Sequence, residues 1–325
     1  MKLKHIATIG LALAPTAAFA GPAINGAGAT FPAPIYQRWF QDYASASGDR
    51  VNYQSVGSGA GIRQFIAGTV DFGASDEPIK ASEAKKVKRG VVQIPMVGGT
   101  IAIAYNKPGC KLKLTQKQTV DIFSGRITDY KQVGCTAGKM TVVHRSDGSG
   151  TTYAFTNSLG AFGGWTAGVG KSINWPTGVG AKGNEGVSGT IKNTPGAIGY
   201  VNTGFVRPNK LQAAVLQNKA GNFVGPSAVT GAAALNGIKV DPVTLAGEDP
   251  NPSGAKAYPI STLTWILAYK SGYPAGKAEA VREALTYALS GKAQGLADDL
   301  GYVPLSGSIL NKARLKVKQV GLGEK

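Results

Sequence analysis

Residues 142–156 read Val-Val-His-Arg-Ser-Asp-Gly-Ser-Gly-Thr-Thr-Tyr-Ala-Phe-Thr, and this stretch organises the rest of the chain. Its β-branched start predicts the end of a strand. The middle is a turn of Asp, Gly and Ser, and Tyr153, Phe155 and Leu159 then continue with helical spacing. The stretch therefore predicts a strand, a turn and the N-terminus of a helix.

Such a turn is suited to an anion. The first backbone N–H groups of a helix have no partner inside it and carry partial positive charge, and small residues let an anion approach them. Ser149 and Thr151 add hydroxyl donors. Arg145 offers a planar fork of donors for an oxyanion, and Asp147 is near enough to hold that fork. An ordinary capped helix with a solvated Arg-Asp pair explains the same residues.

Composition indicates a globular protein with an anionic partner. A chain of 325 residues with 43% apolar residues is long enough for two domains. The formal net charge of +17 favours anions. No basic helix or aromatic-and-basic strand supports nucleic-acid binding, so none is predicted. Solubility, or loose attachment to an anionic cell surface, is the alternative role of these charges.

Residues 1–20 have the pattern of a cleavable signal peptide. Lys2 and Lys4 precede an apolar run, and Ala18-Phe19-Ala20 forms an A-x-A cleavage site. No later stretch has 18 uninterrupted apolar residues. We therefore expect an exported, periplasmic protein.

The chain has two cysteines, Cys110 and Cys135, both in the part that would be exported. In an oxidising compartment a disulfide between them is the natural interpretation. Metal ligation and nucleophilic catalysis are the alternatives for these thiols.

Along the chain, strands alternate with helices, which predicts an α/β fold with a largely parallel sheet. Residues 91–95 lead through Gly98-Gly99 to a buried run at 101–105, interpreted as a crossing between two lobes, and 258–269 is a matching long strand. A lysine-rich helix is expected at 81–89, whereas 218–256 has the least structured pattern.

The turn pattern occurs again in the first half of the chain. Gly57-Ser58-Gly59 also follows a strand and opens an amphipathic helix, as Gly148-Ser149-Gly150 does. With Thr30-Phe31 before Pro32, three helix N-termini would point at one cleft. Glycine-rich turns between strands and helices are common, so chance remains an alternative.

Four motifs together resemble the phosphate-binding proteins of Pst phosphate ABC transporters, which are type II solute-binding proteins. They span residues 26–34, 71–76, 145–151 and 195–201, and the similarity covers nearly the whole mature chain. The resemblance implies a two-lobed fold with a two-stranded hinge. It implies lobe I at 21–98 and 262–325, and lobe II at 99–261.

The resemblance also implies one phosphate between the lobes, with no metal or cofactor. Its implied contacts are Thr30, Phe31, Ser58, Asp76, Arg145, Ser149, Gly150 and Thr151, with Asp147 holding Arg145. Inorganic phosphate and the permease subunits of an ABC importer are the implied partners, and a monomer is expected. Gly59 departs from the family, which often has serine there.

Asp76 is the contact with the clearest chemical meaning. A carboxylate beside an anion is repulsive unless the ligand brings a proton, so Asp76 is expected to accept a P–OH group and to exclude sulfate. Capping of a helix that begins near Glu77-Pro78 is the alternative role.

An enzyme and a surface or secreted protein are the two alternatives to a transport function. After signal cleavage His144 is the only histidine, and no G-x-S-x-G elbow or grouped metal ligands support a hydrolase or a phosphatase. A non-enzyme is therefore expected. A surface or secreted phosphate-binding protein, with a matrix or phosphatase role, is the remaining alternative.

Overall fold

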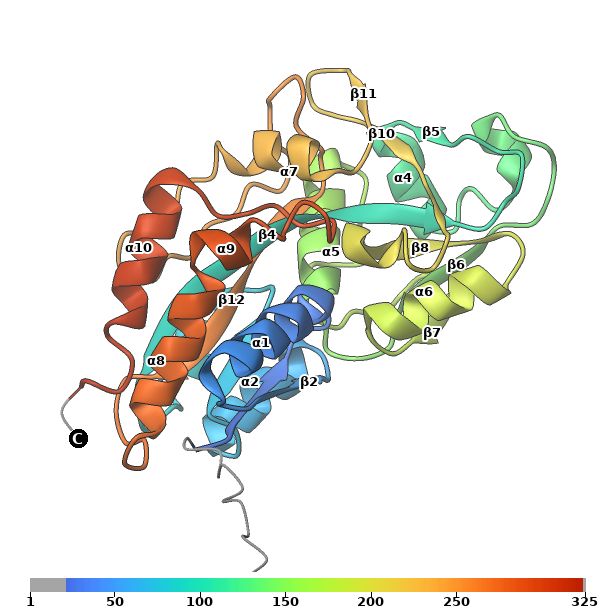
Figure 1. Ribbon diagram of the computed structural model, residues 1–325. Coiled ribbons are helices and arrows are strands. Elements are labelled where there is room, and N and C mark those ends of the chain that lie inside the picture. The colour runs from blue at the N-terminus through green and yellow to red at the C-terminus, as the bar shows by residue number, and fades with distance from the viewer. Residues whose placement is uncertain (1–21, 324–325) are drawn as a thin grey trace, which may run out of the picture.

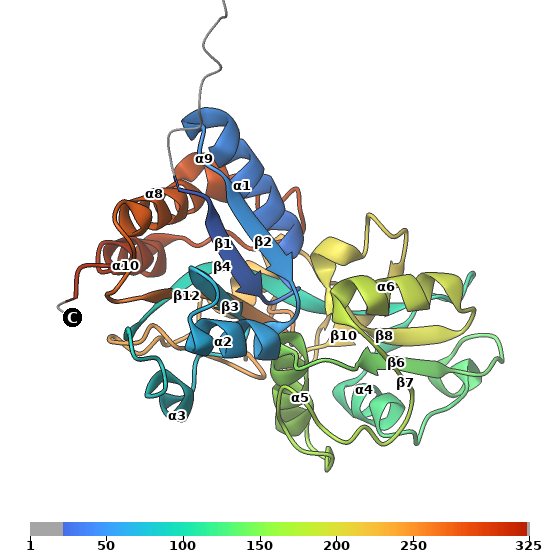
Figure 2. The ribbon, with the colours of Figure 1, turned by 90° about the horizontal axis from the view of Figure 1, so that it is seen from below.

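The computed structural model describes residues 22–323, which form two lobes, and the long strand β4 (Val91–Tyr105) runs from one lobe into the other (Figures 1 and 2). The predicted signal peptide at 1–20 lies outside the described residues. Helices cover the strands of both lobes, so the predicted two-lobed α/β fold is confirmed.

The main sheet runs through both lobes in the order β2-β1-β3-β12-β4-β8-β6-β7. Within each lobe the central strands are parallel, whereas β12 and β8 both run antiparallel to β4. Lobe I contains β1 (Ile24–Gly28), β2 (Val51–Ser55), β3 (Phe72–Ser75) and β12 (Ser261–Tyr269). Lobe II contains β6 (Thr141–Arg145), β7 (Val179–Ala181), β8 (Ala197–Asn202) and the short β9 (Gln212–Ala213) on β4.

Strand β4 changes partner where it passes between the lobes. Its residues 91–100 pair with β12, and residues 101–105 pair with β8. At the change, the Ile101 N–H donates to the Ile260 carbonyl at 2.8 Å, so the chain entering β12 lies beside β4. These two adjacent segments confirm the predicted two-stranded hinge. The strand continues through Gly98-Gly99 without a break, so 91–95 and 101–105 are one strand.

Helices of lobe I pack around its part of the sheet: α1 (Ala33–Ser47), α2 (Ser58–Ala67), α3 (Ala81–Ala84), α8 (Lys277–Ala288), α9 (Gly291–Gln294) and α10 (Gly307–Val317). Helix α1 has the amphipathic spacing and the C-terminal glycine that the sequence predicts for it. Ile35, Tyr36 and Trp39 are fully buried on one face, and Gly48 ends the helix in the left-handed region at φ 82°.

Helices of lobe II are α4 (Gln116–Phe123), α5 (Gly150–Phe162) and α6 (Gly183–Asn193). Beside them β5 (Lys113–Leu114), β10 (Val215–Gln217) and β11 (Phe223–Val224) make a small second sheet. Helix α7 (Ala228–Leu235) packs on the hinge strands β4 and β12.

Two sequence predictions differ from the structure. The helix expected at 81–89 is helical only over Ala81–Ala84, and Val87 is the one buried apolar residue of its remainder. The stretch 218–256 contains α7, which was not predicted. The Ser227 hydroxyl caps α7 by accepting from the Thr230 N–H at 3.1 Å.

The chain between α7 and β12 contacts both lobes. The carbonyls of Thr244 and Leu245 accept hydrogen bonds from the Gln93 and Trp265 side chains of lobe I. Asn251 then bonds Gln116 of lobe II. Within residues 22–323 no helix is long and apolar enough to span a membrane.

Cys110 and Cys135 form a disulfide, as predicted, with their Cα atoms 5.5 Å apart. The bond joins the loop between α4 and β6 to the segment between β4 and β5. Its sequence separation is 25 residues.

Purified exported protein should therefore show no free thiol when it is denatured without reductant, and two after reduction. Reduction should lower the free energy of unfolding by roughly 3 to 4 kcal/mol, because the denatured chain gains the entropy of an open loop. Thiol titration and denaturant unfolding measure both effects. Two reactive thiols in the unreduced sample would contradict the assignment.

Candidate functional site

The candidate site lies between the lobes, where four helices begin: α1 and α2 of lobe I, and α5 and α6 of lobe II. Helix α2 of lobe I and α5 of lobe II lie next to each other (Figure 2), and the Gly150 N–H donates to the Ser58 hydroxyl at 3.1 Å. Thr30-Phe31 leads into α1, and the Thr30 hydroxyl accepts from the N–H of Asn184 at the start of α6. The structure thus brings helix N-termini of lobe I into contact with helix N-termini of lobe II.

All nine predicted site residues occur in this region. Thr30, Phe31, Ser58, Asp76, Arg145, Ser149 and Thr151 are each at most 4% exposed. Gly150 is buried, and Asp147 is half-buried. Direct contacts between the lobes join Ser58 to Gly150, and Thr151 to Asp76.

Arg145 is a buried cation held in one orientation. Its Nε and Nη2 donate to the two carboxylate oxygens of Asp147 at 2.7 and 2.5 Å, and its side chain is 1% exposed. Burial acts to raise the pKa of Asp147, but the hydrogen bonds and charge of Arg145 lower it below the usual value. Nη1 is directed to the Thr151 hydroxyl at 3.4 Å. The edge of the guanidinium formed by Nε and Nη2 is therefore fixed by Asp147, and the Nη1 edge is directed to the site.

Several backbone donors at the site have no protein acceptor. Within residues 22–323, the N–H groups of Thr30, Phe31, Ser58 and Thr151 make no hydrogen bond to another protein group. Ser58 and Thr151 belong to the first turns of α2 and α5, where intrahelical acceptors are lacking. A buried N–H without a partner is costly, so these four donors indicate that the site is built for an external acceptor.

Asp76 is the acidic group of the site. Its two carboxylate oxygens accept hydrogen bonds from the hydroxyls of Thr264 at 2.8 Å and Thr151 at 3.1 Å. Burial is the main cause that raises its pKa, to about 7, although both hydroxyls and Arg145 act to lower it. No described helix begins at Glu77-Pro78, and α3 begins only at Ala81, so the alternative of a helix cap is wrong.

Sequence reasoning missed two polar residues of the site. Asn184 is fully buried, and its Nδ2 donates to Thr30 at 2.8 Å and to Thr151 at 3.3 Å. Thr264 supports Asp76 from hinge strand β12. A threonine within the apolar run 263–269 was the available signal for Thr264. Asn184 had only its position at a helix start, directly after a glycine.

Two glycines permit the close approach of the lobes. A Cβ atom at Gly150 would lie 2.5 Å from the Ser58 hydroxyl and 2.7 Å from the Asp76 nitrogen. Gly59 donates to the Gly148 carbonyl at 2.8 Å, and a Cβ there would lie 3.2 Å from Gly148. The departure from serine at position 59 therefore lies at a backbone contact between the lobes.

An aromatic cluster supports Arg145 from behind. Phe155 stacks on Tyr200 with ring centroids 4.3 Å apart, and the Tyr200 hydroxyl accepts from the Arg145 N–H at 3.1 Å. His144 stacks on Trp175, and its Nδ1 lies 3.1 Å from the Arg145 carbonyl. Burial lowers the pKa of His144, which favours the neutral imidazole. His144 thus has a packing role in this arrangement.

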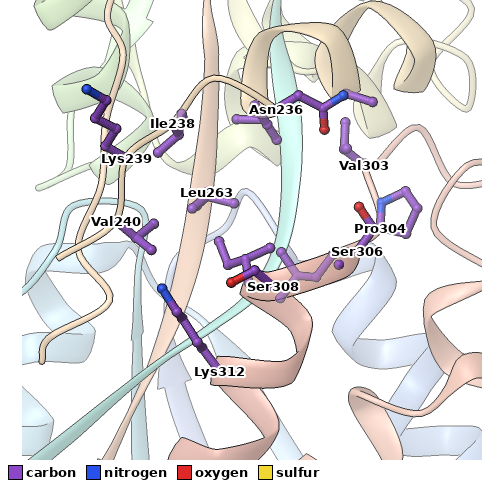
Figure 3. A pocket seen from close by; sticks show the side chains of 15 residues that line it. Asn236, Ile238, Lys239, Val240, Leu263, Val303, Pro304, Ser306, Ser308 and Lys312 are labelled. Carbon is purple, nitrogen blue, oxygen red and sulfur yellow. The ribbon is translucent and has the colours of Figure 1, made fainter. Parts of the chain in front are cut away.

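A separate pocket of about 500 Å³ lies outside the candidate site, between α7, β12 and the start of α10 (Figure 3). Apolar side chains such as Leu263 and Val303 line it, together with Lys239 and Lys312. None of the nine predicted site residues belongs to its lining.

Comparisons with known proteins point to one family. A family model described as a PBP superfamily domain matches residues 14–292. The phosphate-binding protein PstS of Haemophilus influenzae is 38% identical over 312 residues, which cover 91% of this chain and 92% of that protein.

Solved structures share the fold. One is a high affinity periplasmic phosphate-binding protein bound with phosphate, with a TM-score of 0.77 and 24% identity, covering 90% of this chain and 93% of that one. Another is an ABC-type phosphate transport receptor from Vibrio cholerae, with a TM-score of 0.57 and 23% identity, covering 86% and 99%.

The raised pKa of Asp76 predicts how stability depends on pH. Because its pKa is about 7 when folded and near 3.8 when unfolded, the folded chain binds more protons between these values. The free energy of unfolding should therefore fall as pH rises from about 4 to about 7. Asp76→Asn removes this loss and should stabilise the ligand-free protein by about 4 kcal/mol at pH 8.

Denaturant unfolding of dialysed protein at pH 4 and pH 8 measures the effect. Near pH 4 the variant and the unmodified protein should differ little, because Asp76 is protonated in the folded protein. If the variant and the unmodified protein differ in stability by the same amount at both pH values, the pKa of Asp76 is not raised in the folded protein.

Proposed function

The chain belongs to the PBP superfamily and, within it, to the phosphate-binding PstS proteins, and we propose that it captures inorganic phosphate between its lobes and delivers it to an ABC-type import permease. The single observation that carries this proposal is the buried, oriented Arg145 beside four backbone N–H groups that lack a protein acceptor. Such donors match a tetrahedral oxyanion.

The proposed ligand contacts divide by lobe. Lobe I contributes the N–H groups of Thr30, Phe31 and Ser58, and lobe II contributes Arg145 with the first turn of α5. That turn includes Ser149, Gly150 and Thr151, and Asp147 orients Arg145. Because each lobe holds only part of the donor set, an anion between them favours the closed arrangement.

Asp76 makes the site selective for a protonated oxyanion. Its buried carboxylate accepts from two hydroxyls and faces the same turn as Arg145. Hydrogen phosphate can donate its P–OH to this carboxylate, whereas sulfate has no proton near neutral pH. Sulfate would place two negative oxygens against each other in a water-poor site, so phosphate is favoured by a repulsion against its competitor.

The lobe boundaries of the proposal follow the hinge. We propose lobe I at 21–98 and 262–325 and lobe II at 99–261, and the change of β4 from β12 to β8 after Thr100 supports this division. Closing about β4 and β12 would report phosphate occupancy to the permease subunits. No catalytic step is part of this function.

Export and a monomeric state complete the proposal. The signal-peptide pattern at 1–20, together with a disulfide that requires an oxidising compartment, supports a periplasmic location. We propose that the mature chain acts as a monomer with one phosphate per chain.

Arg145→Ala should reduce phosphate affinity at least a hundredfold without unfolding the protein. The change removes charge-assisted hydrogen bonds worth about 1.5 to 3 kcal/mol each and leaves Asp147 facing the ligand. Calorimetric titration gives the affinity. Arg126→Ala is the matched control, because Arg126 also pairs with an aspartate, Asp121, but its side chain is 50% exposed. Unchanged affinity in Arg145→Ala would remove Arg145 from the site.

Asp76→Asn should raise sulfate binding relative to phosphate by a factor of ten or more, about 1.4 kcal/mol. Asparagine keeps the size of aspartate, but its amide can donate to a sulfate oxygen. Asp71→Asn, at the other end of β3, is the control and should keep the phosphate-to-sulfate ratio. An unchanged ratio in Asp76→Asn would refute the proposed basis of selectivity.

A further inference from the structure

One lysine connects the lobes beside the phosphate site. Lys171 lies in the loop between α5 and β7 of lobe II, and its ammonium pairs with Glu77 and, at 3.4 Å, with Glu83. Both glutamates belong to lobe I, Glu77 after β3 and Glu83 in α3. Their side chains are 3% and 23% exposed, and that of Lys171 is 15% exposed. This is a largely buried ion pair that crosses between the lobes.

Lys171 also contacts the site through its backbone. Its carbonyl accepts from the Ser149 N–H at 2.9 Å, and the Ser149 hydroxyl caps α5. Its partner Glu77 directly follows Asp76, the acidic group of the site. The backbone of Lys171 therefore bonds the turn before α5 in lobe II, and its side chain pairs with the residue after Asp76 in lobe I.

The two lysines that pair with Glu77 come from different lobes, so only one of the two ion pairs depends on closure of the lobes. Among residues 22–323, Glu77 forms ion pairs with two lysines, Lys171 from lobe II and Lys80 from its own lobe at 3.3 Å. The Lys80 side chain is 58% exposed. A partner from the same lobe moves with Glu77, whereas Lys171 leaves it when the lobes separate. Removing a partner from a buried charge is far more costly than breaking an exposed pair.

We propose that Lys171 is an interlobe latch, a positioning residue whose ion pairs with Glu77 and Glu83 set how long the closed form retains phosphate. The inference rests on the proposed function, because it assigns a role in phosphate release. Lys171 is not among the proposed phosphate contacts. It acts on the dissociation rate, since its contacts form after the lobes have come together.

Lys171→Met tests the latch, because methionine keeps the aliphatic stem and the backbone contact to Ser149 but removes the charge. Lys80→Met is the matched control, since it removes a charge from the same carboxylate without crossing the lobes. Rates of phosphate binding and release are measured by stopped-flow with a fluorescent phosphate sensor as the trap. We expect Lys171→Met to accelerate release about tenfold and to change association less than twofold, with Lys80→Met near the unmodified protein.

Two further readouts separate a latch from a general structural role. Rising salt should accelerate release in the unmodified protein more than in Lys171→Met, because screening weakens the ion pair that the variant lacks. Glu77→Gln should add little to Lys171→Met, because both changes break one interaction.

Release in Lys171→Met within twofold of the unmodified protein, or an equal acceleration in Lys80→Met, would overturn the latch while leaving phosphate binding intact. An unmodified protein that binds no phosphate would overturn the proposed function, and the latch with it.

Discussion

The bidentate pair of Arg145 and Asp147 is the interaction on which the rest of the site depends. A guanidinium that is 1% exposed needs a neutralising partner, and Asp147 supplies it through both oxygens. Asp147 also accepts from the Gly183 N–H at 3.0 Å, which fixes the start of α6. Across the lobes, Gly57 at φ 90° comes so close that a Cβ would lie 2.2 Å from an Asp147 oxygen. This ion pair thus lies against the end of β6, the start of α6 and the turn before α2.

The topology explains why so many donors meet at this pair. Parallel strands present their carboxyl ends at one edge of a sheet, and the helices that follow start there. Strands β1, β3 and β6 each end at a site residue or at the turn before one. Because β4 belongs to the sheets of both lobes, these two edges face a common site. Small residues at the contact then allow the lobes to close on a ligand.

Local patterns made much of this predictable. The turn at 145–151 and the strands before it are defined by adjacent residues, so Arg145, Asp147 and Ser149 could be selected from sequence. Contacts made by tertiary packing could not. Asn184 reaches Thr30 and Thr151 from a helix more than thirty residues away from either, and Lys171 reaches Glu77 from a loop with no periodic pattern. Helix α7 was not predicted because its alanines and glycine give no amphipathic pattern. It is stabilised by packing on the hinge strands, which are distant in sequence.

We propose that a fixed guanidinium, free backbone donors and a buried carboxyl together select one protonated oxyanion. The decisive measurement is calorimetric titration of the unmodified protein at pH 8, where Asp76 is mostly ionised, with phosphate, sulfate and a phosphate monoester. We expect one bound phosphate per chain and no measurable binding of sulfate or of the ester, whose organic group would have to enter the buried contact between the lobes. Absence of phosphate binding, or sulfate binding of equal strength, would contradict it.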